Sequence, residues 1–303
     1  MITEMLASPL MQRALIAAVL VGLAAPVVGT YLVQRGLALM GDGIGHVSLT
    51  VVSLGWLVGA GLGVSPADAL AVPGAIVASL AGALLIELIR QAGHTRGDVA
   101  LAILFYGGIA GGVILIKFAG GTTTNLNSYL FGSIATVSEN DVRTTAVLAL
   151  LILAVGIGLR GPLFALCHDE EFARACGLPV GVLNILVAEG SALTVSVSMR
   201  VVGVLLVSAV MIVPVAIAKL VSHSFGRTLN LAMVLGVCAC LAGLFITYAV
   251  AVSPGAMIVC LLVATYALTA VLTWGAKRVF KRKDLEDERL VNGRLPEVEA
   301  SRG

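Results

Sequence analysis

Asp42 and His46 are the two residues whose types and spacing could hold a metal ion. They lie four positions apart in the stretch RGLALMGDGIGHVSL (35–49), so on a helix they would share one face. A carboxylate beside an imidazole suits a divalent ion such as Zn²⁺, Mn²⁺ or Fe²⁺. The alternative is an internal Asp–His pair that only holds helices together. Because two ligands cannot complete a coordination shell, the pattern is typical of a site that an ion occupies only briefly.

A second informative stretch is RGPLFALCHDEEFARACGLPV, a loop at 160–180 that contains the signals of a short helix. Asp169 can cap its start, Gly177 can end it, and the acidic first turn suits the helix dipole. The predicted helix, 169–177, would dock on a partner protein or lie on the lipid interface. The acidic turn favours the protein, because the membrane surface is negative. The residues assigned to this docking are Asp169, Glu170, Glu171, Phe172, Arg174 and Gly177.

Glu189 is the other acidic residue deep in an apolar stretch, LVAEGSAL (186–193). An ionisable residue inside the membrane is costly, and this makes it a functional candidate by default. Glu189 is therefore a further candidate for contact with a metal ion. The alternative, which we favour, is that it pairs with a hydroxyl or backbone group.

The chain that must position these residues is unusually apolar. Hydrophobic residues make up 59% of it and charged residues only 12%, about half the fraction typical of soluble domains. A soluble domain could not cover its surface with so few charges. The composition predicts an all-α, polytopic transmembrane helix bundle and excludes a soluble enzyme, a disordered protein and a disulfide scaffold.

Nine stretches approach the length of about 20 residues that a transmembrane helix needs. They are 12–34, 36–60, 70–90, 98–119, 142–160, 181–199, 200–219, 228–250 and 255–276. The sixth and seventh form one apolar run that must fold near 198–200, and without that fold there are eight spans. Glycines four residues apart, such as Gly108 and Gly112, predict close packing between helices.

The positions of Lys and Arg predict the orientation. Fifteen of the 19 lie in the C-terminal tail or in alternate loops, which places these segments and the C-terminus in the cytoplasm. We expect a transmembrane domain over 1–276, with the cytoplasmic loop at 161–180. The tail, 277–303, mixes both signs of charge and is predicted to be disordered.

The sequence lacks the motifs of several enzyme classes. It has no GxxxxGK[ST] phosphate loop, no nucleophile elbow and no HExxH. We therefore expect no enzymatic activity and no permanently bound cofactor. The mixed charge of the tail also argues against a nucleic-acid partner.

Five stretches, in order along the chain, resemble the membrane permease subunits of bacterial zinc/manganese/iron ABC importers. They are RGLALMGDGIGHVSL, GDVALAILFYGG at the start of the fourth span, NSYLFGSI (127–134), DEEFARACGLPV, and VVGVLLVSAVMIVPVAIAKL (201–220). The resemblance covers residues 12–275. It departs from the family pattern after His46, where Val47-Ser48-Leu49-Thr50-Val51 replaces the Ala-Val-Leu-Pro-Gly of many members.

This resemblance implies a multi-pass protein of the cell membrane that forms a homodimer around a central path. Two cytoplasmic ATPase subunits would dock on it, and an extracellular metal-binding protein would supply the ion. Asp42 and His46 match the residues that contact the ion in the family, and Asp169 to Gly177 match the loop that couples to the ATPase.

The predicted function is import of a divalent metal, Zn²⁺ first and otherwise Mn²⁺ or Fe²⁺. One alternative is an ABC permease for a metal chelate such as a siderophore or cobalamin, which would need a wider cavity and no ion ligands. The other is a proton-coupled secondary carrier, which would need no ATPase and leaves the helix at 169–177 unexplained.

Overall fold

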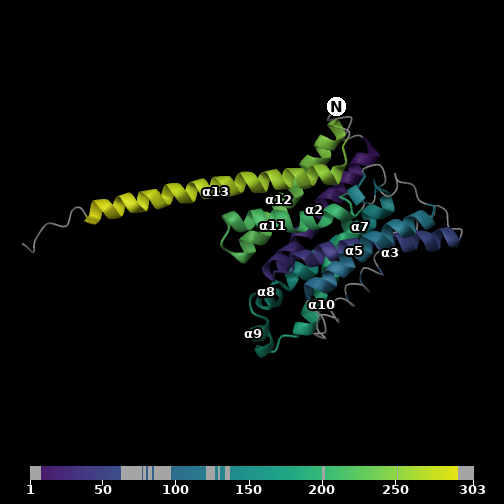
Figure 1. The fold of residues 1–303 in the computed structure, drawn as a ribbon, viewed down its shortest axis with the longest axis horizontal. Helices are drawn as coiled ribbons and strands as arrows, with labels where there is room; N and C mark the ends of the chain where they lie inside the picture. Colours follow the sequence, from purple (N-terminus) through teal and green to yellow (C-terminus); the bar gives the residue numbers. More distant parts are fainter. Residues whose placement is uncertain are drawn as a thin grey trace, which may run out of the picture.

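The computed structural model describes residues 8–62, 97–120, 137–199, 202–250 and 252–292, with isolated positions between 77 and 84 and between 127 and 133. The regular structure in these ranges is helical, as the composition predicts (Figure 1). The helices are α2 (Pro9–Gln34), α3 (Ala38–Gly61), α5 (Gly97–Phe118), α7 (Glu139–Gly158), α8 (Arg160–His168), α9 (Glu170–Ala175), α10 (Val180–Ser198), α11 (Val204–Val221), α12 (Phe225–Ala249) and α13 (Pro254–Asn292).

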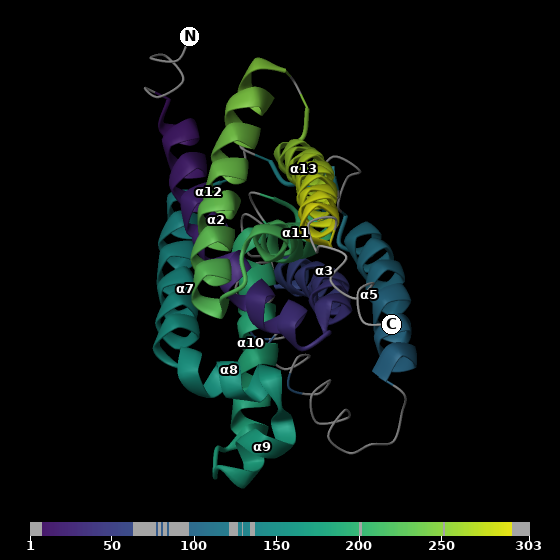
Figure 2. The same cartoon turned by 90° about the vertical axis from the view of Figure 1, so that its left-hand side faces the viewer.

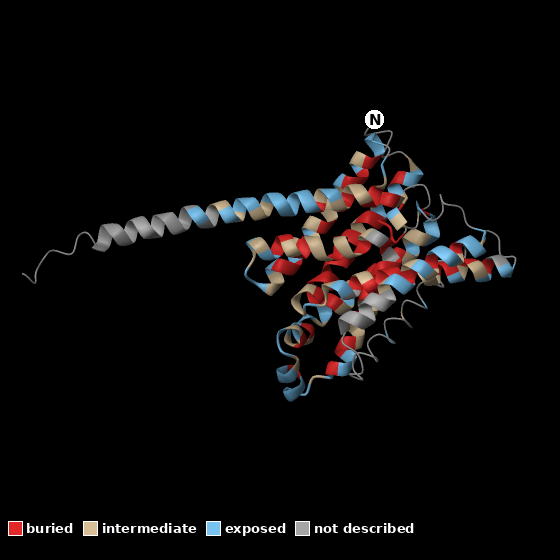
Figure 3. Cartoon of the chain, in the orientation of Figure 1, coloured by how far each residue is buried: buried red, intermediate tan, exposed pale blue. Residues whose placement is uncertain are grey.

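Helix α2 lies at the centre of the bundle, with α7, α10, α11 and α12 packed around it (Figure 2). Most of its residues from Met11 to Leu32 are buried, and buried residues are concentrated in this part of the molecule (Figure 3). Small residues allow the close approach. A Cβ at Gly29 would lie 1.9 Å from the carbonyl oxygen of Met211 on α11, so only glycine fits there.

Several helices are long and apolar enough to cross a membrane. Among the described residues these are α2, α7, α12 and the Pro254–Gly275 part of α13, and three shorter apolar helices lie at 105–118, 180–196 and 206–221. The predicted fold in the long apolar run is confirmed, because α10 ends at Ser198 and α11 begins at Val204. Gly203 permits the turn with a φ of +89°. The predicted span at 70–90 lies outside the described residues, apart from isolated positions.

Two segments differ from the sequence-based expectation. Residues 160–168, for which the sequence predicts a loop, form the short helix α8, with Pro162 in its first turn and Leu163 and Leu166 buried. The predicted disorder from residue 277 onward also differs from the structure over 277–292, where α13 continues (Figure 1). Lys, Arg, Glu and Leu predominate in that segment, and all four favour helix. Residues 293–303 lie outside the described part of the chain.

Candidate metal-ion site

Asp42 and His46 face the same side of α3, as their spacing predicts. His46 Nε2 lies 3.9 Å from Asp42 Oδ1, which is too long for a hydrogen bond. Adjacent ligands of one tetrahedral or octahedral ion, each bound at about 2.1 Å, lie roughly 3.0–3.4 Å apart. The two atoms are about half an ångström farther apart than that, so a small rotation of the carboxylate would let a single ion bridge them.

Access to the pair is from the side of the carboxylate. The side chain of His46 is only 4% exposed, whereas that of Asp42 is 32% exposed. An ion would reach Asp42 first and then exchange a further water ligand for the buried imidazole. This arrangement suits stepwise dehydration of an ion better than a closed, permanent site.

A residue that the sequence analysis missed holds the carboxylate in place. Ser208, on α11, donates a hydrogen bond of 2.8 Å to Asp42 Oδ1. The bond fixes the carboxylate from a second helix, and it uses only one of the two lone pairs of Oδ1, the oxygen that lies 3.9 Å from His46 Nε2. Ser208 lies in an apolar run, VLLVSAVM, where a lone hydroxyl was the only signal of its role.

Packing, rather than hydrogen bonding, fixes the imidazole. The ring of Phe105 on α5 meets His46 edge to face, with 4.1 Å between ring centroids. No described residue hydrogen-bonds to the buried Nδ1 of His46. The orientation of the ring therefore depends on how closely α5 approaches α3.

That approach is possible because of glycine on α5. A Cβ at Gly108 would lie 2.5 Å from the carbonyl carbon of His46, and Thr50 Oγ1 donates a 2.6 Å hydrogen bond to the Gly108 carbonyl. The predicted packing of Gly108 and Gly112 is thus confirmed, since Gly112 lies against Leu49. Helix α3 runs unbroken through 47–51, where the chain departs from the family pattern.

The pair is not a complete metal site by itself. Within the described part of the chain, no group of three or more His, Cys, Asp or Glu residues could hold a metal ion. The remaining ligands would have to be water, backbone or another subunit. Weak, partial coordination of this kind allows an ion to leave again.

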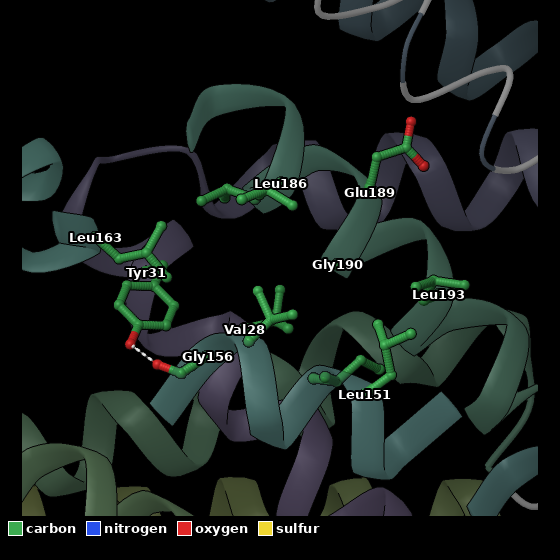
Figure 4. Close-up of a pocket in the computed structure, with 12 residues that line it drawn as sticks. Val28, Tyr31, Leu151, Gly156, Leu163, Leu186, Glu189, Gly190 and Leu193 are labelled. Carbon is green, nitrogen blue, oxygen red and sulfur yellow. Dashed lines mark hydrogen bonds between the residues drawn. The ribbon is translucent and has the colours of Figure 1, made fainter. Parts of the chain in front are cut away.

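Glu189 lies elsewhere in the bundle. It borders a small cavity of about 70 Å³ whose lining is mostly apolar and does not include Asp42 or His46 (Figure 4). Its carboxylate points away from Tyr31 and Val28 in that view, and its Oε2 has no hydrogen-bond partner among the described residues. The structure does not bring Glu189 together with the Asp–His pair, and its role in an ion pathway stays a prediction.

Helix α9 forms as its signals predict. Asp169 Oδ1 accepts a 2.9 Å hydrogen bond from the Phe172 amide, and Gly177 closes the helix with a φ of +78°. Phe172 is 62% exposed although it is aromatic. An exposed aromatic residue on a short helix at one end of the molecule (Figure 2) is typical of a docking surface.

Beside α9, the thiol of Cys167 is hydrogen-bonded and protonated. Its Sγ donates to the carbonyl oxygen of Tyr31 at 3.6 Å. Burial raises the pKa of this thiol to about 11, although the nearby charge of Arg35 acts in the opposite direction. The group is therefore a neutral thiol at neutral pH.

The chain is similar to known proteins over most of its length. The profile of the ABC 3 transport family matches residues 7–273. The chain is 32% identical to the manganese transport system membrane protein MntC of Halalkalibacterium halodurans over 91% of this chain and 94% of that protein. It is 31% identical to the chelated iron transport system membrane protein YfeD of Yersinia pestis, over 93% and 92%.

A solved structure shows the same fold. The structure of PsaBC from Streptococcus pneumoniae in complex with Fab superposes with a TM-score of 0.77 and 32% sequence identity. The match covers 89% of this chain and 95% of the matched chain. The arrangement of helices seen here is therefore one that a related protein adopts.

Proposed function

This chain belongs to the ABC 3 transport family, and on that basis we propose that it is the permease through which Mn²⁺ or Fe²⁺ enters the cell. It is a multi-pass membrane protein and a permease subunit of an ABC transporter, and it is not itself catalytic. An ABC transporter is driven by ATPase subunits, so membership of this family argues against the alternative of a proton-coupled secondary carrier.

The observation that carries the proposal is the bridging geometry of Asp42 and His46, with the carboxylate oriented by Ser208. Carboxylate and water ligands suit Mn²⁺, and a single imidazole is compatible with both Mn²⁺ and Fe²⁺. The relatives reported above are named for manganese and chelated iron. They do not support the zinc preference expected from the sequence, which stays a prediction.

The remaining parts of the proposal concern the partners. We propose that two copies of the chain enclose the path, that α9 docks on a cytoplasmic ATPase, and that an extracellular binding protein delivers the ion. The exposed Phe172 supports the docking of α9. An ion bridged by Asp42 and His46 does not need the wide cavity that a chelate would require, which favours the free ion as substrate.

A deletion strain grown on chelator-treated medium tests the choice of metal. We expect its cellular Mn or Fe content to fall and growth to recover when that metal alone is supplied in excess. Re-expression of the wild-type chain should restore the content at low external metal. A strain that loses only zinc, or that loses no metal but fails to use a siderophore, would contradict the proposal.

Ser208→Ala should weaken the handling of the ion without disturbing the fold. Hydrogen bonds to charged groups contribute about 1.5–3 kcal/mol, so we expect the KM for metal uptake to rise at least about tenfold. Ser191→Ala is the matched control, because Ser191 is a buried serine whose one hydrogen bond among the described residues is within its own helix, to the Val187 carbonyl. Equal KM values for the two variants would exclude a positioning role for Ser208.

A further inference from the structure

Arg35 is a buried charge that joins three helices. Its side chain is 8% exposed and lies where α2 ends. One nitrogen, Nη1, donates a 2.6 Å hydrogen bond to Asn184 Oδ1 on α10, and Nη2 donates one of 2.9 Å to Glu170 Oε2 on α9. We refer to Arg35, Glu170 and Asn184 as the Arg35 cluster.

The chemistry of the Arg35 cluster depends on the guanidinium group. A buried cation is costly unless a carboxylate and further hydrogen-bond partners surround it. The planar fork of arginine can satisfy two acceptors in fixed directions at once, which a lysine ammonium does less well. The cluster is therefore a stiff connection, and its ionic part reaches α9 only through Glu170.

Glu170 has a partner on each of its carboxylate oxygens. Besides the bond from Arg35, its other oxygen, Oε1, accepts a long hydrogen bond of 3.4 Å from the exposed Arg174 within α9. The cap formed by Asp169 fixes the helix start one residue before Glu170. The bond from Arg35 at 2.9 Å is the shorter of the two, and it is the contact through which a displacement of α9 would reach Arg35.

The connection from Arg35 to the metal-ion site is short. Gly36 turns the chain with a φ of +69°, Leu37 donates a backbone hydrogen bond of 2.9 Å to the Leu32 carbonyl, and α3 begins at Ala38. Asp42 follows one turn into that helix. Because this turn is short and hydrogen-bonded, a displacement of Arg35 would also displace the start of α3, the helix that carries Asp42 and His46.

We infer that the Arg35 cluster couples α9 to the metal-ion site, so that Arg35 is a positioning residue for transport and not an ion ligand. The inference rests on the proposed function, in which an ATPase docks on α9. When the ATPase moves α9, Glu170 pulls on Arg35, and Arg35 shifts the start of α3 and thereby Asp42.

Three variants distinguish a coupling role for the bond between Arg35 and Glu170 from the alternative that Glu170 only neutralises the buried charge of Arg35. Glu170→Ala removes the link and leaves Arg35 unpaired. The double variant Glu170→Ala/Asn184→Asp gives Arg35 a new carboxylate partner on α10 and keeps the net charge of the wild type. Glu139→Ala is the matched control, because Glu139 is an exposed acid that pairs with an arginine, Arg143, at the start of α7 and lies outside the docking residues.

The first readout does not depend on the metal. In the full complex with its ATPase, we measure amide hydrogen exchange in residues 36–46 with and without a non-hydrolysable ATP analogue. Wild type and Glu139→Ala should show a nucleotide-dependent change in exchange. The double variant Glu170→Ala/Asn184→Asp should assemble like wild type and lose the change.

The second readout is transport in proteoliposomes. The double variant should move about tenfold fewer ions per ATP hydrolysed, as expected for a coupling free energy in the usual range. A double variant that retains both the exchange response and the wild-type ratio would overturn the inference, as would a wild type without any response. A wild type that responds to nucleotide but moves no divalent metal would instead refute the proposed function.

Discussion

Uptake of the metal ion should fall by at least about a hundredfold when either Asp42 or His46 is replaced by alanine. Loss of residues that only support metal ligands typically costs 10–100-fold, and these two side chains are the ones placed to touch the ion. The 3.9 Å between His46 Nε2 and Asp42 Oδ1 can be bridged only while both are present. The measurement is initial uptake of radioactive or fluorescently detected Mn²⁺ in proteoliposomes.

Isosteric changes distinguish an ion site from a pair that only joins helices. Asp42→Asn and His46→Gln keep hydrogen-bonding capacity, so a pair of structural importance alone would tolerate them. If the pair contacts the ion, both should lose uptake although the complex assembles. Ser53→Ala is the control on the same helix, because within the described part of the chain its hydroxyl bonds only to the Leu49 carbonyl. Wild-type uptake by the double alanine variant would refute the site.

Gly108→Ala should disrupt the site although Gly108 carries no functional group. Its Cβ would lie 2.5 Å from the His46 carbonyl carbon and 2.7 Å from the Val47 nitrogen, and both are backbone atoms that cannot turn aside. Helix α5 must then move away from α3, breaking the hydrogen bond from Thr50 and the contact between Phe105 and His46. Overpacking of this kind costs about 1–3 kcal/mol.

Gly107 provides a control one residue away. A Cβ there would meet nothing within 4 Å, so Gly107→Ala should leave the fold unchanged. Thermal unfolding in detergent, followed by size-exclusion of the surviving fraction, compares the two variants, and uptake is measured on the same preparations. Equal stability and equal uptake of both would show that the close approach of α5 to α3 does not matter.

Much of the fold and part of the site could be predicted from sequence because the signals are local. The length of an apolar stretch predicts a membrane helix, the spacing of Asp42 and His46 predicts a shared face, and Asp169 and Gly177 mark the ends of a helix. Each of these depends only on residues within about one or two turns, whose relative positions the helix itself determines.

The contacts that complete the site could not be predicted in the same way. Ser208 lies 166 residues from Asp42, and Glu170 lies 135 residues from Arg35. Periodicity identifies the buried face of a helix but not the helix that will cover it, because in lipid that choice depends on packing of small residues and polar contacts. The orienting serine and the Arg35 cluster therefore emerged only from the three-dimensional structure.

The central position of α2 has a consequence for how the protein is made. Its covering helices α11 and α12 begin at Val204 and Phe225, so they leave the ribosome long after Gln34. At about 5–20 residues per second, this delay is roughly 10–40 s. During that time the glycine-lined face of α2 is open to lipid and to foreign helices. A nascent chain that stops before α12 therefore exposes an unsatisfied packing surface.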